Sequence, residues 1–376
     1  MAISDKTQSF EEFPPVSKAE WLAKVEKDLK GKPVSDLDFE VGEIKMSPFH
    51  HLDDFKKLPK PLPANNGWEI GEDITVTPNL IETNKTLLAA LEAGINAPRL
   101  VLNQQISVED LAILLNKVDV EIISTQFYFI NKNNTPQHFL SCFKKYVSEN
   151  NFDLKKVNIG INWAGEDAVE QPEIIHLLGQ LKNGNYNVKA LPVNGLPYFS
   201  ESNPAHELAA ILIKGENFIK QYSSSEFSPE FINQHLFFSV AIGKNYFLQI
   251  AKMRALTLLW ANIMQGYQIN SGMPTMDAHL APTSQSEDEN TNMIAATTQA
   301  MSAIIGGANR LTVLPADAFK GTNSSFAKRI ARNVQHLLQG ESYFGRVEDP
   351  AAGSYYIEKL TQELAERAWE VFQKSC

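Results

Sequence analysis

Cysteine is almost absent from this sequence, which contains only Cys142 and Cys376. Two cysteines cannot form a disulfide framework or a cysteine-based metal site. Long apolar runs are also missing, because none approaches the ~18 residues that a transmembrane helix needs. The first residues lack the hydrophobic segment of a signal peptide. We therefore expect a soluble cytoplasmic protein, with Cys142 buried in an apolar run.

Basic charge is scarce as well. The chain carries 34 Lys and Arg residues against 44 Asp and Glu residues, which gives a net charge of −10. Nucleic acids and anionic membrane surfaces bind to basic faces, so we expect neither as a partner. The sequence also lacks a phosphate loop, a Gly-x-Gly-x-x-Gly fingerprint, a Gly-x-Ser-x-Gly elbow and a His-Glu-x-x-His zinc helix. These absences predict no metal site.

The first 70 residues differ from the rest of the chain. Residues 17–30 have the apolar spacing of an amphipathic helix, and a proline-containing stretch follows. Four residues form the apolar face of this helix: Trp21, Leu22, Val25 and Leu29. Because this region has too few apolar residues for a core of its own, we predict an N-terminal arm over residues 1–70. Its apolar face packs either on its own chain or on a partner, and Trp21, Val25 and Leu29 are the candidate interface residues.

A strand–helix alternation begins near residue 80. The predicted strands are 99–102, 120–123, 157–161, 188–193, 236–241, 275–280 and 311–313, with a possible eighth at 355–357. Helices between them carry start and stop signals, such as Ser107 with Asp110 three residues later, and Gly94 after residues 80–93. This alternation predicts an α/β fold with a (β/α)8 TIM barrel over residues 71–376. A doubly wound open sheet is the alternative.

His279 stands at the end of a predicted strand, and the carboxyl ends of barrel strands carry active sites. With Asp277 it forms an Asp-x-His string similar to the cobalamin-ligating Asp-x-His-x-x-Gly motif, but Pro282 replaces the required glycine. We therefore expect His279 not to ligate cobalamin. Together with Thr283 and Ser284 it is a candidate for the substrate pocket, and a purely structural histidine is the alternative.

Segments after residue 241 carry the motifs of one known family. They are Ala241–Phe247, Ala251–Ala255, Leu258–Trp260, Thr297–Thr298, Ala300–Met301, Gly306–Gly307, Arg329–Asn333 and Asp349–Tyr356. Upstream, Glu82–Asn84, Gly94 and Ser107–Asp110 also match. On these residues the chain resembles the methylmalonyl-CoA mutase family over residues 15–376, most closely after residue 241.

The resemblance implies a (β/α)8 barrel that binds an acyl-CoA through its centre, capped by a separate C-terminal cobalamin domain. The implied reaction is the radical interconversion of methylmalonyl-CoA and succinyl-CoA, in which adenosylcobalamin supplies the radical.

The sequence departs from this family pattern in three places. It ends at Cys376, where the family continues into its cobalamin domain. The family's catalytic Tyr-His pair aligns with Leu196 and Pro197, neither of which has a side-chain donor. The family's Arg-Thr-x-x-Gln-Thr-Ser-Gly-Trp stretch is shortened into residues 282–290, where the acidic run 287–289 would oppose coenzyme A phosphates. We therefore expect no catalytic residue in this chain.

These departures favour the small, non-catalytic beta subunit of a heterodimeric mutase, with only the barrel portion present. This chain would then bind no cofactor, and adenosylcobalamin would lie in the assembled isomerase of propionate metabolism, with a larger catalytic subunit as the partner. Two alternatives remain open. One is an active acyl-CoA mutase barrel that uses a separate cobalamin-binding chain, and the other is a stand-alone barrel repurposed as a binding protein.

Overall fold

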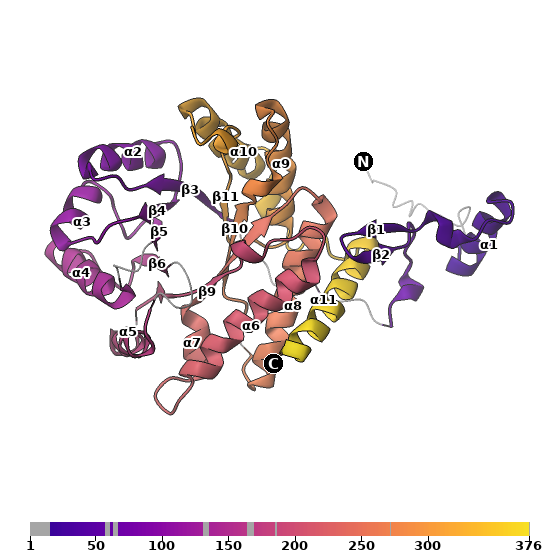
Figure 1. Ribbon diagram of the computed structural model, residues 1–376, viewed down its shortest axis with the longest axis horizontal. Coiled ribbons are helices and arrows are strands. Elements are labelled where there is room, and N and C mark those ends of the chain that lie inside the picture. Colours follow the sequence, from indigo (N-terminus) through magenta and orange to yellow (C-terminus); the bar gives the residue numbers. More distant parts are fainter. Residues whose placement is uncertain are drawn as a thin grey trace, which may run out of the picture.

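A parallel β-barrel forms the centre of the molecule (Figure 1). The computed structural model describes residues 16–56, 61–62, 67–130, 135–163, 169–184, 186–270 and 272–375. The barrel strands are β3 (Glu69–Thr75), β4 (Ala97–Leu102), β5 (Ser124–Phe129), β6 (Asn158–Trp163), β7 (Val188–Lys189), β8 (Leu191–Asn194), β9 (Leu236–Ile242), β10 (Thr275–Leu280) and β11 (Arg310–Thr312).

The strand order closes the barrel. The nine strands pair in the order β7-β6-β5-β4-β3-β11-β10-β9-β8, and every pair is parallel. Only Ala190 separates β7 from β8 in the chain, so these two segments are halves of one strand. The first half pairs with β6 and the second with β9. This arrangement confirms the predicted (β/α)8 barrel and excludes the open sheet.

Helices surround the barrel. They are α2 (Leu80–Glu92), α3 (Val108–Leu114), α4 (Pro136–Glu149), α5 (Gln171–Gly184), α6 (Pro204–Tyr222), α7 (Pro229–His235), α8 (Tyr246–Gly266), α9 (Glu289–Ile305), α10 (Ser325–Gly340) and α11 (Tyr355–Ser375). Several begin and end at the expected signals. Ser107 and Asp110 form a reciprocal capping box at the start of α3, and Gly94 ends α2 with a positive φ of 88°. Within the described residues, no helix is both long and apolar enough to span a membrane.

Two strand predictions are wrong. Residues 120–123 form a turn in which Ile122 is 78% exposed, and the strand begins after them at Ser124. Residues 355–357 start α11, because Ile357 belongs to a buried stripe that continues at helical spacing through Leu360 and Leu364. One strand of the barrel was not predicted from the sequence, namely β3, which lies at the junction with the arm. The division of the chain near residue 70 stays a prediction.

A buried ion cluster ties the late family motif to the barrel helices. Arg254 on α8 binds Asp349, and its second amino group lies 2.9 Å from Glu358 on α11. All three side chains are almost completely buried. The cluster therefore fixes the end of the chain against α8. Cys142, which was expected in the core, is only partly buried on α4, and Cys376 lies outside the described residues.

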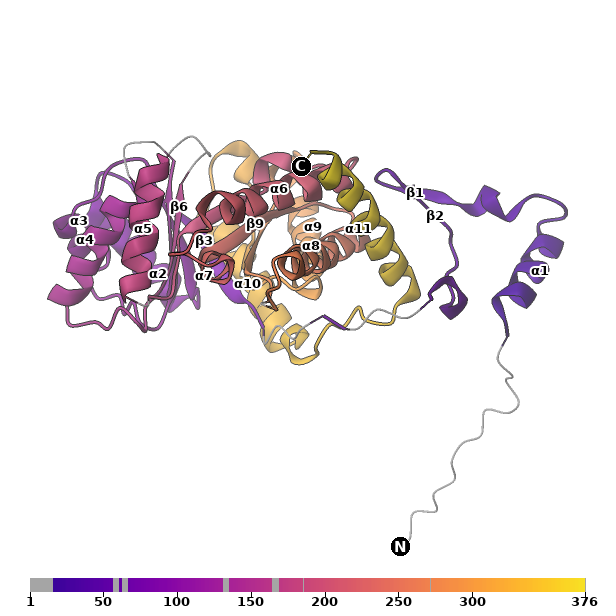
Figure 2. The ribbon, with the colours of Figure 1, turned by 90° about the horizontal axis from the view of Figure 1, so that it is seen from below.

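The arm packs on its own chain at one end and extends away from the barrel at the other (Figure 2). Strands β1 (Phe39–Val41) and β2 (Ile44–Met46) form an antiparallel hairpin beside α11. The carbonyl oxygen of Glu43 in its turn accepts a hydrogen bond from Arg367 at 2.8 Å, and its Oε1 accepts one from the backbone of Ala205 at 3.1 Å. The hairpin is thus anchored on α6 and α11.

The predicted arm helix is present as α1 (Lys18–Asp28), with a capping box between Ser17 and Glu20. No residue of α1 is buried. Trp21 stacks on Phe49 of the same arm, with ring centroids 3.9 Å apart, and the candidates Val25 and Leu29 are only partly covered. The apolar face of α1 is therefore incompletely buried within the described part of the chain.

Candidate functional site

A cavity of about 450 Å³ opens at the carboxyl ends of the barrel strands. This is the end at which (β/α)8 barrels carry their active sites. Its walls are mostly apolar, and its few polar side chains come from the ends of four strands and one loop. The lining residues are Asp73, Arg99, Leu196, Pro197, Phe199, Ala241, His279, Leu280, Ala281, Pro282, Thr283, Thr312 and Leu314.

Leu196 and Pro197, which are predicted to align with the family's Tyr-His pair, line this cavity together with His279. They belong to a short 3-10 helix, Leu196–Tyr198, that follows β8 directly. Neither side chain carries a hydrogen-bond donor. The wall that this segment forms can exclude water from a ligand, but it cannot donate a proton or a hydrogen bond to one.

The three candidate pocket residues are not equivalent. His279 and Thr283 line the cavity. Ser284 is absent from the lining, because its hydroxyl donates a hydrogen bond to the Ala281 carbonyl at 2.6 Å and accepts one from Gln299 at 2.9 Å. Ser284 therefore holds the loop after β10 in place.

Below the cavity, the barrel axis is filled by a polar cluster centred on Asp277. The carboxylate of this residue accepts a hydrogen bond from Gln126 on β5 at 2.6 Å, and it lies 3.4 Å from Nε2 of His279. The guanidinium of Arg310 on β11 is 3.9 Å away. We call Gln126, Asp277, His279 and Arg310 the axial cluster. All four residues are buried.

Neighbouring groups of the barrel interior determine the charge state of Asp277. Burial alone would raise the pKa of Asp277, but the charges of His279, Arg310 and Arg99 lower this pKa to about 2. Asp277 is therefore ionised at neutral pH.

Two further ion pairs flank the axial cluster along the barrel axis. Arg99 forms a bidentate pair with Asp73, at 2.8 and 2.6 Å, on the carboxyl side. Arg310 binds Glu69 at 3.1 Å and the hydroxyl of Ser124 at 2.6 Å on the amino side. Both arginines are buried. Ionisable side chains from four strands, β3, β4, β10 and β11, thus occupy the centre of the barrel.

The charged residues at the centre of the barrel were not predicted from the sequence, although one signal was available. Arg99 is a charged residue inside the otherwise apolar strand β4, and Asp73 and Arg310 each precede a buried aliphatic residue, Ile74 and Leu311. Such spacing indicates side chains that point into a barrel rather than toward the helices. Which charges meet depends on barrel closure, since Gln126 and Asp277 are 151 residues apart in the chain.

A second buried ion pair supports the wall of the cavity. Lys252 on α8 lies 2.8 Å from Glu207 on α6 and also donates a hydrogen bond to the carbonyl of Ala241 at 2.7 Å. Burial raises the pKa of Glu207 and lowers the pKa of Lys252, and the attraction between the two charges opposes both shifts. The pair is inaccessible to solvent, so we assign it a positioning role for the Ala241 edge of the cavity.

Two residues of the acidic run 287–289 make contacts that stabilise the local structure. Asp288 is the N-cap of α9 and accepts hydrogen bonds from the hydroxyl of Thr291 and from the backbone of Thr291 and Asn290, which lower its pKa. Glu289 binds Lys320. Negative charge at this helix start is favourable, and it also places acidic groups on the loop that lines the cavity with Thr283.

The described residues do not fit cobalamin. A histidine ligand must present an accessible nitrogen to the metal. His279 is 6% exposed inside the barrel, and its Nε2 faces Asp277. Within the described ranges there is also no group of three or more His, Cys, Asp or Glu residues placed to hold a metal ion.

Comparison with known proteins places these features in a family. The methylmalonyl-CoA mutase family model matches residues 185–375, about half of the chain. The chain is 31% identical to the methylmalonyl-CoA mutase small subunit of Porphyromonas gingivalis, over 98% of this chain and 64% of that protein. It is 36% identical to the small subunit of Streptomyces virginiae over 54% of this chain and 33% of that protein. The small subunit of Propionibacterium freudenreichii subsp. shermanii is 26% identical over 96% of this chain and 62% of that protein.

The matched region contains β7 to β11 and the helices packed on them, and therefore includes Leu196, Pro197 and Asp277. The chain spans less than two thirds of the length of these three relatives. The barrel, its carboxyl-end cavity and the family match together show that the chain belongs to the methylmalonyl-CoA mutase family.

Proposed function

We propose that this chain acts as the non-catalytic small subunit of a methylmalonyl-CoA mutase and supports a larger catalytic subunit. In the assembled isomerase the larger chain would hold adenosylcobalamin and interconvert methylmalonyl-CoA and succinyl-CoA in the cytoplasm. Similarity to proteins named as small subunits supports this assignment. The name of those relatives implies a larger partner, which we propose for this chain as well.

The axial cluster is the observation that carries the proposal. An acyl-CoA that passed through the barrel would have to displace Gln126, Asp277 and Arg310 from their mutual contacts. Breaking a buried charge pair by removing one partner costs about 3–5 kcal/mol. The loss of donors at Leu196 and Pro197 adds to this obstacle, because a thioester carbonyl in the cavity would have no hydrogen-bond donor on that wall.

The apolar face of the arm helix α1 supports the proposal that this chain binds a partner. Trp21, Val25 and Leu29 form an apolar face that the described part of the chain covers only partly. Tryptophan is the residue type most enriched at the energetic centres of interfaces. We propose that this face of α1 contacts the larger subunit.

Activity of the purified chain tests the proposal. With adenosylcobalamin and methylmalonyl-CoA, the chain alone should give no succinyl-CoA. The control is the same chain co-expressed with its larger partner, in which turnover should appear. Turnover by the chain alone, with the partner excluded by mass spectrometry, would contradict the proposal.

Co-purification from the source cell separates the alternatives. A larger mutase chain should be recovered if this chain is a small subunit. Recovery of a short cobalamin-binding chain would instead favour an active barrel with a separate cofactor chain. Recovery of neither would favour a stand-alone binding protein.

A further inference from the structure

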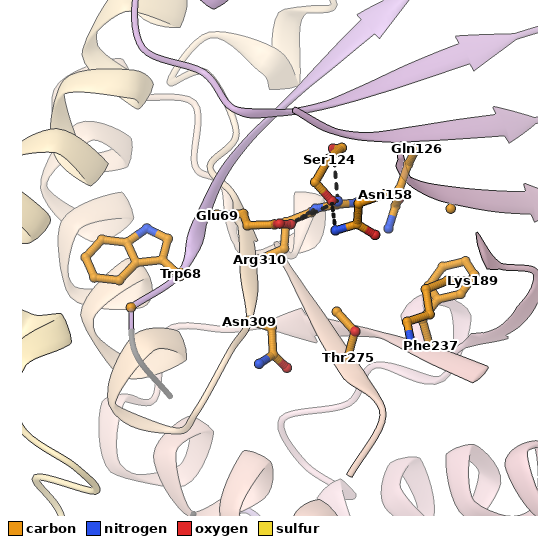
Figure 3. Close-up of a pocket in the computed structure, with 12 residues that line it drawn as sticks. Trp68, Glu69, Ser124, Gln126, Asn158, Lys189, Phe237, Thr275, Asn309 and Arg310 are labelled. Carbon is orange, nitrogen blue, oxygen red and sulfur yellow. Dashed lines mark hydrogen bonds and ion pairs between the residues drawn. The ribbon is translucent and has the colours of Figure 1, made fainter. Parts of the chain in front are cut away.

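A second cavity lies at the opposite end of the barrel, where the strands begin (Figure 3). It has a volume of about 350 Å³, near the lower end of the range for small-molecule sites. Figure 3 shows Lys189 and Phe237 on one side, and Trp68, Glu69 and Arg310 on the other. None of the candidate residues predicted from the sequence lies in this cavity.

Two cations and one carboxylate line this amino-end cavity, and two of these three charges are paired with each other. Glu69 lies 3.1 Å from Arg310, whose guanidinium also donates to the carbonyl and hydroxyl of Ser124. Lys189 has no carboxylate partner among the described residues. Its ammonium group donates one hydrogen bond, to the carbonyl of Gln234 at 2.6 Å. The amino-end cavity thus contains one cation that is not paired with a carboxylate of the described residues.

The other walls suit an organic molecule. Trp68 and Phe237 contribute aromatic surface, and Asn158 and Thr275 contribute polar groups. The floor is closed, because the amide of Gln126 is fixed to Asp277 at 2.6 Å in the axial cluster. Gly160 makes room for Gln126, since a Cβ at this glycine would lie 2.9 Å from the Gln126 side chain. A ligand would therefore enter from the amino end and stop at Gln126.

We propose that the amino-end cavity binds a small organic anion whose carboxylate or phosphate group pairs with Lys189. The aromatic walls would contact the apolar part of the anion, and its charged group would supply the negative charge that pairs with Lys189. The inference goes beyond the proposed function and holds whether or not the chain is catalytic.

Titration by calorimetry with inorganic phosphate and with acetate, at constant ionic strength, tests this site on the full chain. We expect saturable binding of at least one anion, and the stronger of the two shows whether the site prefers phosphate or carboxylate. Lys189→Met should weaken that binding by about tenfold or more, the value of one lost charge-assisted hydrogen bond. Lys189→Arg should restore most of it, because the positive charge is kept.

Lys155→Met is the matched control, since Lys155 is exposed on the loop that leads into β6 at the same end of the barrel. It should bind as the original chain does. Burial lowers the pKa of Lys189, so binding should also weaken as the pH rises through that pKa, and this dependence should vanish in Lys189→Met. The site is refuted if neither anion binds, or if Lys189→Met, shown by circular dichroism to be folded, binds as tightly as the original chain.

Discussion

Asp277 illustrates how a single buried residue sets the character of the barrel. Its carboxylate receives a hydrogen bond from one strand and charge from two others, so its ionised state is stabilised in the folded chain only. In the unfolded chain an aspartate titrates near pH 4. The folded protein therefore gains stability above that pH and loses it as the pH falls toward about 2, the folded-state pKa.

The substitution Asp277→Asn should lower the free energy of unfolding at pH 7 by about 3 kcal/mol, because Arg310 and His279 would remain buried with less compensating charge. The difference in the free energy of unfolding between the variant and the original chain should shrink between pH 4 and pH 2, as Asp277 of the original chain becomes protonated. Urea unfolding at a series of pH values measures both effects.

Asp36→Asn is the control for this measurement, since Asp36 is exposed and should change stability by less than about 0.5 kcal/mol. An equal loss in both variants, or a deficit for Asp277→Asn that is independent of pH, would mean that the axial cluster does not hold an ionised carboxylate.

At the scale of elements, the turn of the β1–β2 hairpin depends on one glycine. Gly42 has a φ of 60°, and a Cβ there would lie 2.9 Å from the carbonyl oxygen of Glu201. Only glycine combines this backbone conformation with so close an approach. The anchor of the arm on α6 therefore requires Gly42.

Gly42→Ala should destabilise the protein by about 1–2 kcal/mol and loosen the hairpin from α6. Faster proteolytic cleavage within residues 39–46 would report the loosening. Gly31→Ala is a matched control, because Gly31 has a φ of 90° but no atom within 4 Å of the added Cβ. If both variants behave alike, backbone strain and not contact with Glu201 accounts for the effect.

Trp21 on α1 is the residue at which binding of the proposed partner can be tested. Trp21→Ala should weaken association with the larger subunit by about 2 kcal/mol, because tryptophan in an interface centre contributes on that scale. The melting temperature of the isolated chain should barely change, since Trp21 stacks on Phe49 of the arm and no residue of α1 is buried. Surface plasmon resonance and calorimetry measure the two quantities.

Glu26→Ala, on the exposed side of α1, should leave both quantities unaltered. A drop of several degrees in the melting temperature of Trp21→Ala with unchanged partner affinity would assign the arm helix to the fold of its own chain.

Elements were predicted from the sequence where local signals were strong. Ser107 with Asp110 and the glycine at 94 marked helix ends correctly, because capping chemistry acts within a few residues. The aromatic run Tyr355–Ile357 was misassigned, since β propensity outweighed the helical spacing that continues to Leu364. The position of β3 was missed because its Gly, Glu and Asp residues have low strand propensity, and barrel closure overrides that preference.

The site was predictable only in part. His279 and Thr283 line the carboxyl-end cavity, at a strand end and in the loop after it, because barrel topology alone fixes which end of a strand faces the cavity. Their role in binding a substrate stays a prediction. The axial cluster depends on which strands face each other across the barrel. That pairing follows from strand register, which the sequence of a single strand does not specify.

At the scale of the whole molecule, the axial cluster lies between the two cavities of the barrel. One opens at the carboxyl end beside Leu196 and Pro197, and the other opens at the amino end beside Lys189. A long ligand cannot span them without dismantling the cluster.

Coenzyme A should therefore bind this chain only weakly, because its pantetheine arm cannot pass the axial cluster between the two cavities. Calorimetry should give a dissociation constant in the millimolar range or weaker, and the larger catalytic subunit serves as the positive control. Micromolar affinity of this chain for coenzyme A would show that the barrel opens along its axis in solution.

The axial cluster also limits how the sequence of this barrel can evolve. Its four residues come from β5, β10 and β11, and its charges extend to Arg99 on β4. Replacing any one of the charged residues alone leaves its partners buried without compensation, at a cost of about 3–5 kcal/mol against a total stability of 5–15 kcal/mol for typical domains. No series of single substitutions reopens the axis without passing through strongly destabilised intermediates. The buried charges thus retain the closed state of the barrel through their contribution to its stability.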